Sequence, residues 1–280
     1  MRPDAVTRFA PSPTGPLHLG HAYAALIAQR RAGAGRFLLR IEDIDQSRCR
    51  PEHEAQIYDD LAWLGLRWET PVMRQSDRMP AYRAALAQLA EMGLIYPCRC
   101  TRADIRAAMS APQEGAELGP DGVTYPGTCR DRPMQEAGPT DALRLNMRAA
   151  VARVAQLGFS ETGPIKSGRH EIDRGWLCEV AGDVVLARRD MGTSYHLSVV
   201  VDDAAQDITE VTRGVDLFDA TPVHVLLQAL LELPRPTYYH HDLIRDEAGK
   251  RLAKRDDARA ISLYRREGAS PEDIRLRIGL

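Results

Sequence analysis

Two histidines, His18 and His21, stand three residues apart in the stretch PSPTGPLHLGH, which spans residues 11–21. Proline and glycine punctuate this stretch and a helical pattern begins near Leu19, so the pair lies where a loop enters a helix. A helix start offers unpaired backbone N–H groups and a positive dipole end, and Gly20 lets a ligand approach the backbone closely. Together with two imidazole donors, this loop is suited to binding the phosphates of a nucleotide. By itself an HxxH pair is a weak signal.

A second basic motif, GKRLAKR, occupies residues 249–255 and follows the last expected strand. Flexible ammonium and guanidinium groups at this density can close on a polyphosphate and neutralise a departing pyrophosphate. The alternative interpretation is a solvated surface turn, which is the commoner role of a charge run. Neither motif decides the function alone.

The elements that must position these motifs read as strand, helix, strand. We expect a strand over 6–10, a helix from Leu19 and a second strand over 36–41, with acidic residues from Glu42 to Asp45 at its carboxyl end. Ligands of a parallel, doubly wound sheet bind outside the carboxyl ends of its strands. The Pro/Gly loop and the acidic group should therefore share one edge of the sheet.

Further along the chain the pattern changes twice. Helical patterns are expected at 52–64, 80–92 and 221–233, and strand-like segments at 183–189, 194–202, 207–213 and 238–243. Between them, residues 97–175 are rich in Gly, Pro, Cys and Arg with weak periodicity. We interpret this stretch as an insertion with its own stabilising device.

Composition excludes several classes of protein. The chain has 280 residues, 37 Lys+Arg against 39 Asp+Glu, and 44% hydrophobic residues. A chain of this length buries roughly three quarters of its unfolded surface, so it is globular. Its longest apolar stretches, such as 22–28, are far shorter than the ~20 residues that a bilayer requires. The first residues also lack an apolar signal-peptide core.

We therefore expect a cytoplasmic protein with no membrane partner. Five cysteines form an odd number scattered over a long chain, which favours reduced thiols, some of them on a metal, over a disulfide framework. Because the formal charge is only -2, any contact with nucleic acid must be local.

In their order along the chain, the motifs resemble those of class I glutamyl-tRNA synthetases. RFAPSPTGPLHLGH (8–21) is similar to the N-terminal adenylation motif of that family, with HLGH in the position of HIGH. RIEDID (40–45) resembles its RIEDTD strand end, VVVDDAAQDITEVTRGVDL (199–217) its VVDD block, and GKRLAKR its KMSKS loop. The resemblance covers nearly the whole chain. It implies an α/β, Rossmann-like class I aminoacyl-tRNA synthetase catalytic domain with a zinc-binding insertion and a short C-terminal helical segment.

The cysteines resemble those of one group in particular, the glutamyl-Q tRNA(Asp) synthetases, which are truncated relatives. The resemblance implies one structural Zn²⁺ held by Cys98, Cys100, Tyr125 and Cys129. Zinc prefers four tetrahedral ligands, and a CxC turn joined to a YxxxC turn by a long loop can supply them. Since a phenolate is an unusual ligand, the alternative is a three-cysteine site that water completes and over which Tyr125 packs.

The resemblance also divides the chain. We expect the first half of the nucleotide-binding domain at 1–96, the zinc-binding insertion at 97–175, the second half of the catalytic domain at 176–244, and the KMSKS-like loop with a helical segment at 245–280. No anticodon-binding domain is expected.

The resemblance implies roles for individual residues. Glutamate would be bound by Arg8, Phe9, Ala10, Pro11, Ser12, Glu42, Tyr195 and Arg213. ATP, with Mg²⁺, would be bound by His18, Gly20, His21, Arg251 and Lys254. The catalytic residues would be His18, His21 and Lys254, which stabilise the phosphates and the leaving pyrophosphate.

Charge supports this assignment. Glutamate carries two carboxylates and one ammonium, and Arg8, Arg213 and Glu42 are their complements. The alternative for each is a structural ion pair. In the KMSKS position, Ala253 replaces serine and Arg251 replaces the first lysine, so loop closure is expected to be weaker.

The implied function is ATP-dependent, tRNA-independent activation of L-glutamate to glutamyl-adenylate, followed by transfer to queuosine in the anticodon of tRNA(Asp). The partners would be ATP, L-glutamate and that tRNA, bound by a monomer. One alternative is a catalytic fragment or paralogue of glutamyl-tRNA synthetase that charges the tRNA 3′ end. Another is an inactive regulator that binds tRNA or glutamate, against which His18, His21, Glu42 and Lys254 argue because all four are retained.

Overall fold

The computed structural model describes residues 4–101, 103–105, 119–120, 122–244 and 259–280. Its strands are β1 (Val6–Phe9), β2 (Arg36–Ile41), β3 (Met73–Arg74), β4 (Ile95–Cys98), β5 (Ala142–Leu145), β6 (Gly158–Glu161), β7 (Gly168–Glu171), β8 (Val185–Ala187), β9 (Glu210–Gly214) and β10 (Thr237–His241). The α-helices are α1 (Leu19–Ala32), α2 (Pro51–Trp63), α3 (Met79–Glu91), α5 (Met147–Arg153), α6 (Arg174–Trp176), α7 (Tyr195–Ala205), α8 (Thr221–Leu230), α9 (Ile261–Arg266) and α10 (Pro271–Arg277). Shorter helical turns are η1 (Gln75–Arg78), η2 (Met134–Glu136), η3 (Leu177–Ala181) and η4 (Val215–Ala220).

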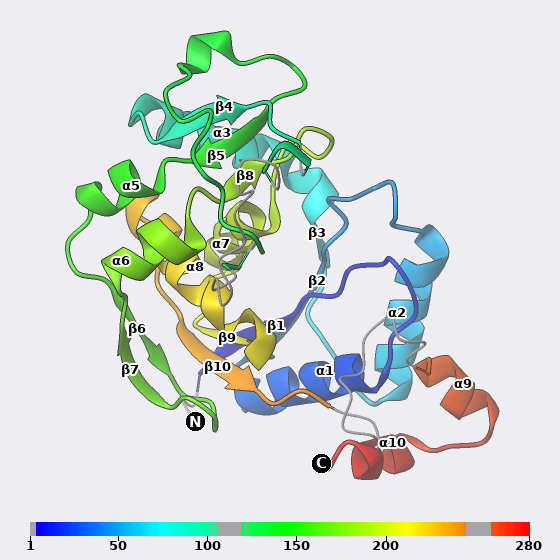
Figure 1. Ribbon diagram of the computed structural model, residues 1–280. Helices are drawn as coiled ribbons and strands as arrows, with labels where there is room; N and C mark the ends of the chain where they lie inside the picture. Colours follow the sequence, from blue (N-terminus) through cyan, green and yellow to red (C-terminus); the bar gives the residue numbers. More distant parts are fainter. Residues whose placement is uncertain (1–3, 102, 106–118, 121, 245–258) are drawn as a thin grey trace.

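The chain opens with a strand–helix–strand unit, as the sequence predicts. All four residues of β1 are buried, and β1 pairs in parallel with β2, which pairs in parallel with β3. Helix α1 makes the connection and buries its alanine- and leucine-rich face, including Ala25 and Leu26, against this sheet (Figure 1). Gly35 fits beside Ala5 because a Cβ there would come within 2.1 Å of the Ala5 carbonyl oxygen.

A second sheet continues the first. Its order is β7-β6-β10-β9, in which β10 runs parallel to β9 and β6, and β7 is antiparallel to β6. Strand β9 lies beside β1, since the Thr209 N–H donates to the Val6 carbonyl at 3.0 Å and the Val6 N–H donates to Thr209 Oγ1 at 2.9 Å. The expected α/β class with parallel strands is confirmed (Figure 1).

A third, antiparallel sheet has the order β4-β5-β8 and lies apart from β10 and β7 in Figure 1. Strands from inside the expected insertion at 97–175 pair with strands from outside it. Strand β4 begins before it and β8 follows it, while β6 comes from within it and pairs with β10. The division into domains stays a prediction.

The strand expected at 194–202 is wrong, because these residues belong to helix α7. Most of this helix is buried, including Leu197, Val199 and Val200, and it packs against α3 and α8. A short apolar segment that is buried on all sides has no clear hydrophobic period of either a strand or a helix. The three consecutive valines at 199–201 therefore led to the prediction of a strand, because valine is common in strands. The other expected helices and strands are confirmed with small shifts at their ends.

The C-terminal helices close one side of the molecule. Ser270 caps α10 in a capping box with Asp273, and Pro271 occupies the first turn, so this short helix has a well-defined start. Ile274 and Ile278 pack into the same apolar cluster as Leu17 from the first loop. No helix in the described part of the chain is long and apolar enough to cross a membrane.

Candidate active site

The HLGH motif forms the start of α1. His18 is the N-cap residue, its Nδ1 accepts from the Gly20 N–H at 3.1 Å, and the His21 Nδ1 accepts from the His18 N–H at 3.1 Å. The two ring centroids lie 3.8 Å apart. Since both Nδ1 atoms act as acceptors, each neutral imidazole carries its proton on Nε2. The motif therefore places two imidazoles, each with its Nδ1 accepting from a backbone N–H, at the N-terminus of α1, where the helix dipole favours an anion.

A cavity of about 440 Å³ lies at the carboxyl ends of β1 and β2. The residues expected to bind substrates that line it are Phe9, Ala10, Pro11, Ser12, His21, Glu42 and Tyr195. The expected shared edge is confirmed, since the Glu42 N–H donates to the Pro11 carbonyl at 3.0 Å and both residues line this cavity. Arg8, His18, Gly20 and Arg213 are not among the lining residues.

Arg8 lies in a buried ion-pair network. Its Nε and Nη2 donate to the two carboxylate oxygens of Asp203 at 2.8 and 3.2 Å. Arg40, which has no exposed surface, donates to the same carboxylate at 2.7 Å and lies 3.4 Å from Glu42 Oε1. Asp203 thus joins β1 and β2 to α7. Arg8 has the structural partner that the sequence left open.

Glu42 links this network to the cavity. Burial raises the pKa of Glu42, although the positive charges of Arg40 and Arg8 act in the opposite direction. Its side chain is 15% exposed, so the carboxylate is accessible from the cavity. An ionised Glu42 can bind an ammonium group there.

Arg213 is buried beneath Tyr195. Its Nη1 donates to the Tyr195 hydroxyl at 3.3 Å and contacts His224 Nδ1 at 3.0 Å. Its Nε donates to His240 Nε2 at 3.0 Å and its Nη2 to Thr221 Oγ1 at 2.7 Å. Among the described residues all of these partners are neutral acceptors, and no carboxylate is paired with this guanidinium. Arg213 therefore carries a buried positive charge that no described carboxylate pairs with directly, next to the Tyr195 side chain that lines the cavity.

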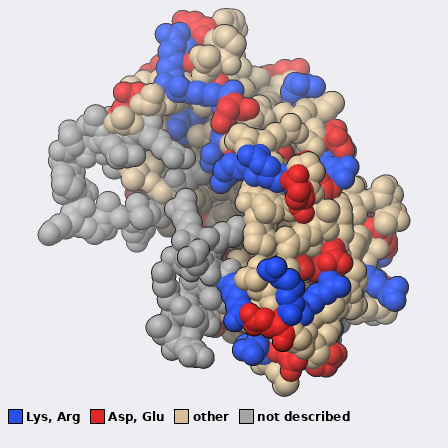
Figure 2. Space-filling model, turned by 90° about the vertical axis from the view of Figure 1, so that its right-hand side faces the viewer, with Lys and Arg blue, Asp and Glu red and all other residues tan. Residues whose placement is uncertain are grey.

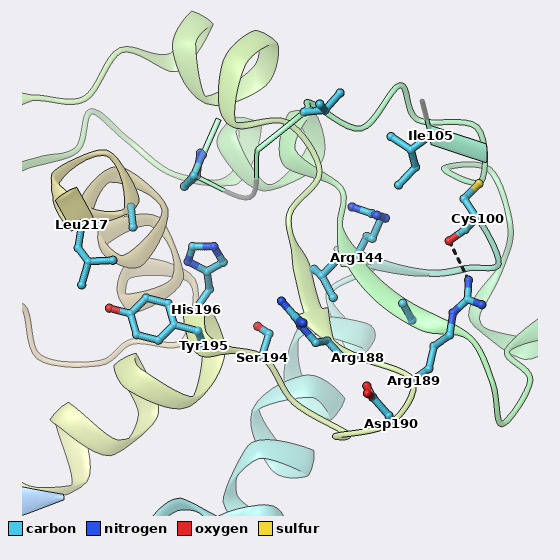
Figure 3. Close-up of a pocket in the computed structure, with 15 residues that line it drawn as sticks. Cys100, Ile105, Arg144, Arg188, Arg189, Asp190, Ser194, Tyr195, His196 and Leu217 are labelled. Atoms are coloured by element: carbon cyan, nitrogen blue, oxygen red, sulfur yellow. Dashed lines mark hydrogen bonds between the residues drawn. The ribbon is translucent and has the colours of Figure 1, made fainter. Parts of the chain in front are cut away.

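A second cavity, of about 700 Å³, is shown in Figure 3, and two of its lining residues, Arg188 and Tyr195, also line the first cavity. Arg188 and Arg189 come from the loop after β8, and Ser194 and Tyr195 from the start of α7. Arg144, from β5, also lines it. Arg144, Arg188 and Arg189 thus line a largely apolar cavity that shares two lining residues with the smaller one.

Cys98, Cys100 and Cys129 gather at the end of β4, with their sulfur atoms within 4.8 Å of one another. The Tyr125 hydroxyl lies 3.4 Å from the sulfurs of both Cys98 and Cys100. Zn–S bonds of about 2.3 Å in a tetrahedron place sulfur atoms about 3.8 Å apart, which agrees with the 3.6 Å between Cys100 and Cys129. The three cysteines can hold a metal ion, and the expected fourth donor stands beside them.

The cluster has two basic neighbours. The Arg144 Nε donates to Cys98 Sγ at 3.3 Å, and its guanidinium lies 3.9 Å from the centre of the Tyr125 ring. Burial opposes ionisation of Cys129, but hydrogen bonds from the Tyr125 hydroxyl and a backbone N–H lower the pKa of this thiol to about 7. Arg189 donates to the carbonyls of Arg99 and Cys100, the latter at 2.8 Å. The cysteine turn is thereby tied to the loop that lines both cavities.

Arg251 and Lys254, with the whole GKRLAKR motif, lie outside the described residues. On the face shown in Figure 2, basic and acidic side chains are interspersed, in keeping with the balanced composition.

Several residues around the site were not singled out by the sequence, among them Asp203, Glu161, His224 and His240. Asp203 belongs to the VVVDD block, but its part as a bridge between arginines depends on contacts more than 160 residues apart in the chain. His240 lies in a strand that the sequence predicted, and the only hint of a special role there was the pair of adjacent histidines at 240 and 241. Glu161 lies in the stretch taken for an insertion.

Comparison with known proteins agrees with this arrangement. The family model for the catalytic domain of class I tRNA synthetases (E and Q) matches residues 4–280. A glutamyl-Q tRNA(Asp) synthetase from Rhodobacter capsulatus is 63% identical over 98% of this chain and 100% of its own length. Another from Nocardia farcinica is 44% identical over 95% of this chain and 81% of its own.

Solved structures show the same fold. A glutamate tRNA ligase from Elizabethkingia meningosepticum, in complex with its amino acid, has a TM-score of 0.71 and 26% identity over 96% of this chain. This chain spans only 59% of that ligase. The resemblance seen in the motifs is confirmed, and the protein is a ligase of the aminoacyl-tRNA synthetase type. Motifs, fold and relatives agree over almost every residue: the chain belongs to the class I tRNA synthetase family of the E and Q type.

Proposed function

We propose that this protein activates L-glutamate with ATP, without needing tRNA, and transfers it to queuosine in the anticodon of tRNA(Asp). The observation that carries the proposal is the 440 Å³ cavity in which His21, Glu42 and Tyr195 meet, with the unneutralised charge of Arg213 beneath Tyr195. The two relatives named above, which match 95% or more of this chain, are named glutamyl-Q tRNA(Asp) synthetase.

In the first step, an oxygen of the glutamate α-carboxylate attacks the α-phosphorus of ATP and the bond to pyrophosphate breaks. The Nε2–H groups of His18 and His21 donate to phosphate oxygens at the start of α1. Glu42 binds the ammonium group, and Arg213 with Tyr195 binds a carboxylate. Lys254 neutralises the departing pyrophosphate. Catalysis is thus mainly positioning and electrostatic stabilisation.

In the second step, a hydroxyl of the queuosine cyclopentenediol attacks the activated carbonyl carbon, the bond to the phosphate breaks, and AMP leaves. We propose that the acceptor nucleoside enters through the 700 Å³ cavity. This cavity shares Tyr195 and Arg188 with the glutamate pocket, and Arg144 and Arg189 supply further positive charge for an RNA backbone.

Two metals belong to the proposal. Mg²⁺ bound to ATP supplies further neutralisation of phosphate charge. Zinc would be held by Cys98, Cys100 and Cys129 with Tyr125, which fit it in donor type and spacing. Its contribution is to fix the turn that Arg189 joins to the cavity loop.

The test is ATP–pyrophosphate exchange with purified protein and glutamate in the absence of tRNA, for which we expect exchange well above that with no amino acid. Exchange that appears only on adding tRNA contradicts the first half of the proposal. The second half is tested with labelled glutamate and two acceptors, native tRNA(Asp) bearing queuosine and an unmodified transcript. Label should appear only on the native tRNA, in its anticodon fragment. Label at the 3′ end of either acceptor supports the alternative of a tRNA-charging paralogue.

A further inference from the structure

The surroundings of Arg213 fix the protonation of its neighbours. A guanidinium has only N–H donors, so His224 Nδ1, 3.0 Å from Nη1, and His240 Nε2, 3.0 Å from Nε, must both act as acceptors. His224 then carries its proton on Nε2, which lies 3.0 Å from His196 Nδ1. His240 must carry its proton on Nδ1. The position of Arg213 thus depends on one tautomer of each ring.

Glu161 is the residue that sets the tautomer of His240. Its Oε2 lies 2.5 Å from His240 Nδ1, and its Oε1 accepts from the backbone N–H groups of His240 at 3.0 Å and Gly163 at 2.6 Å. The side chains of Glu161 and His240 are 0% and 1% exposed. An ionised carboxylate is acceptor-only, so the shared proton stays on Nδ1 and the Nε2 lone pair faces Arg213.

Gly163 makes this close approach possible. A Cβ at this position would lie 2.7 Å from Glu161 Oε1 and 2.4 Å from the His240 carbonyl oxygen. The turn of Glu161, Thr162 and Gly163 after β6 therefore lets the Glu161 carboxylate contact β10, and any side chain at position 163 would block this contact.

We propose that Glu161 and His240 are positioning residues, which align the Arg213 guanidinium for a carboxylate of the amino-acid substrate. The inference rests on the proposed function for the identity of that substrate. Glu161 does not pair with Arg213 directly but acts through the imidazole of His240, which lies between them. The negative charge of Glu161 can therefore orient the Arg213 guanidinium without occupying the place that the ligand carboxylate would take. Arg213 reaches the cavity through Tyr195, which accepts its N–H and can donate its own O–H to the ligand.

The decisive variant is Glu161→Gln, because the structure fixes how the new amide must lie. Two backbone N–H groups converge on Oε1, so the amide oxygen must take that place, and the NH₂ group must then face His240 Nδ1. His240 Nδ1 becomes an acceptor and its proton moves to Nε2, against the Arg213 N–H. The size of the side chain is kept while the tautomer is reversed.

The matched control is Glu210→Gln. Glu210 is a buried glutamate on β9, and its two oxygens accept from Arg31 at 2.6 Å, with no hydrogen bond to Arg213, His224 or His240. For Glu161→Gln we expect the KM for glutamate to rise about tenfold or more while the KM for ATP stays within about twofold. Glu210→Gln should leave both unchanged.

The ring ¹⁵N shifts of His240 give a readout that a merely structural role would not move. The unsubstituted protein, free of ligand, should show the Nδ1–H tautomer, and Glu161→Gln the Nε2–H tautomer. His240→Gln keeps an acceptor near the Nε2 position but has no tautomer, so adding Glu161→Gln to it should not raise the KM for glutamate further.

An Nε2–H tautomer in the unsubstituted protein overturns the inference, even where Glu161→Gln fails to fold. So does a reversed tautomer in Glu161→Gln with an unchanged KM for glutamate. Failure of the proposed function has a different signature, because the unsubstituted protein would then show no glutamate-dependent ATP–pyrophosphate exchange without tRNA, or would place label at the tRNA 3′ end, while its His240 tautomer stayed as described.

Discussion

Glu42 combines two properties that make its charge sensitive to pH. It lines the smaller cavity, and burial raises the pKa of its carboxyl above its ordinary value. An ammonium ligand requires the ionised form. As pH falls through this raised pKa, Glu42 takes up a proton, and we expect the KM for glutamate to increase.

Replacing Glu42 with glutamine tests this directly. A charged hydrogen bond contributes about 1.5–3 kcal/mol, so the KM for glutamate at neutral pH should rise about ten- to a hundredfold. Steady-state exchange rates across the acidic range should show that the variant loses this part of the pH dependence. A KM that is unchanged at neutral pH would remove Glu42 from the ammonium site.

At the residue scale, the sequence was informative where a side chain acts beside its neighbours in the chain. His18 and His21 cap the same helix turn, and their motif predicted their place. It was silent on Asp203, Glu161 and His240, because the contacts that give them their roles join residues between 27 and 195 positions apart in the chain. No local pattern carries such information.

Among the elements, the loop between β8 and α7 connects the cysteine cluster with both cavities. Arg189 binds the carbonyls of Arg99 and Cys100, while Arg188, one residue before it, lines the two cavities. In the proposed function, zinc on the three cysteines would fix the turn that Arg189 contacts. We therefore expect a chelator that removes this zinc to lower the thermal midpoint and to raise the KM for glutamate about tenfold.

The variant Arg189→Ala separates the two effects. It should retain one metal ion per chain by elemental analysis, yet reproduce the raised KM of the metal-depleted protein. Arg174→Ala, which removes an arginine that binds the Val151 and Val154 carbonyls instead, serves as the control. If metal depletion leaves the KM unchanged, the coupling through Arg189 is wrong.

Helices and strands whose ends are marked by glycine or proline could be predicted from the sequence. Those whose form depends on tertiary packing could not. Strand β2 matches its prediction because Gly35 precedes it and its apolar run is short. Helix α7 was mistaken for a strand because packing from α3 and α8 decides its form. The four residues of β6 carry a weak pattern and gain their place from pairing with β10.

For the molecule as a whole, Asp203 connects β1 and β2 to α7 through its ion pairs with Arg8 and Arg40. Replacing it with asparagine would leave Arg8 and Arg40 buried without that negative charge, and losing one partner of a buried pair costs about 3–5 kcal/mol. Equilibrium denaturation should show this loss in the free energy of unfolding.

The control is Glu69→Gln, which breaks the exposed pair of Glu69 with Arg36 and should change stability by no more than about 0.5 kcal/mol. Burial by itself would raise the pKa of Asp203, but the positive charges of Arg8 and Arg40 outweigh it, so the pKa is lowered. Its stabilisation is therefore present above a pH of about 4 and is lost as the acid form appears below that. Equal losses in both variants would contradict a special role for Asp203.

The route of the chain through β6 limits how this protein can be re-engineered. Residues 97–175 do not form a cassette that can be excised or exchanged with a relative, since they supply a strand to the sheet of β9 and β10. Cutting them out would expose an edge of β10 to aggregation and would also take away Glu161. Chimeras that swap the cysteine module should join instead within the turns flanking β4 and β5, so that β6 stays with its parent sheet.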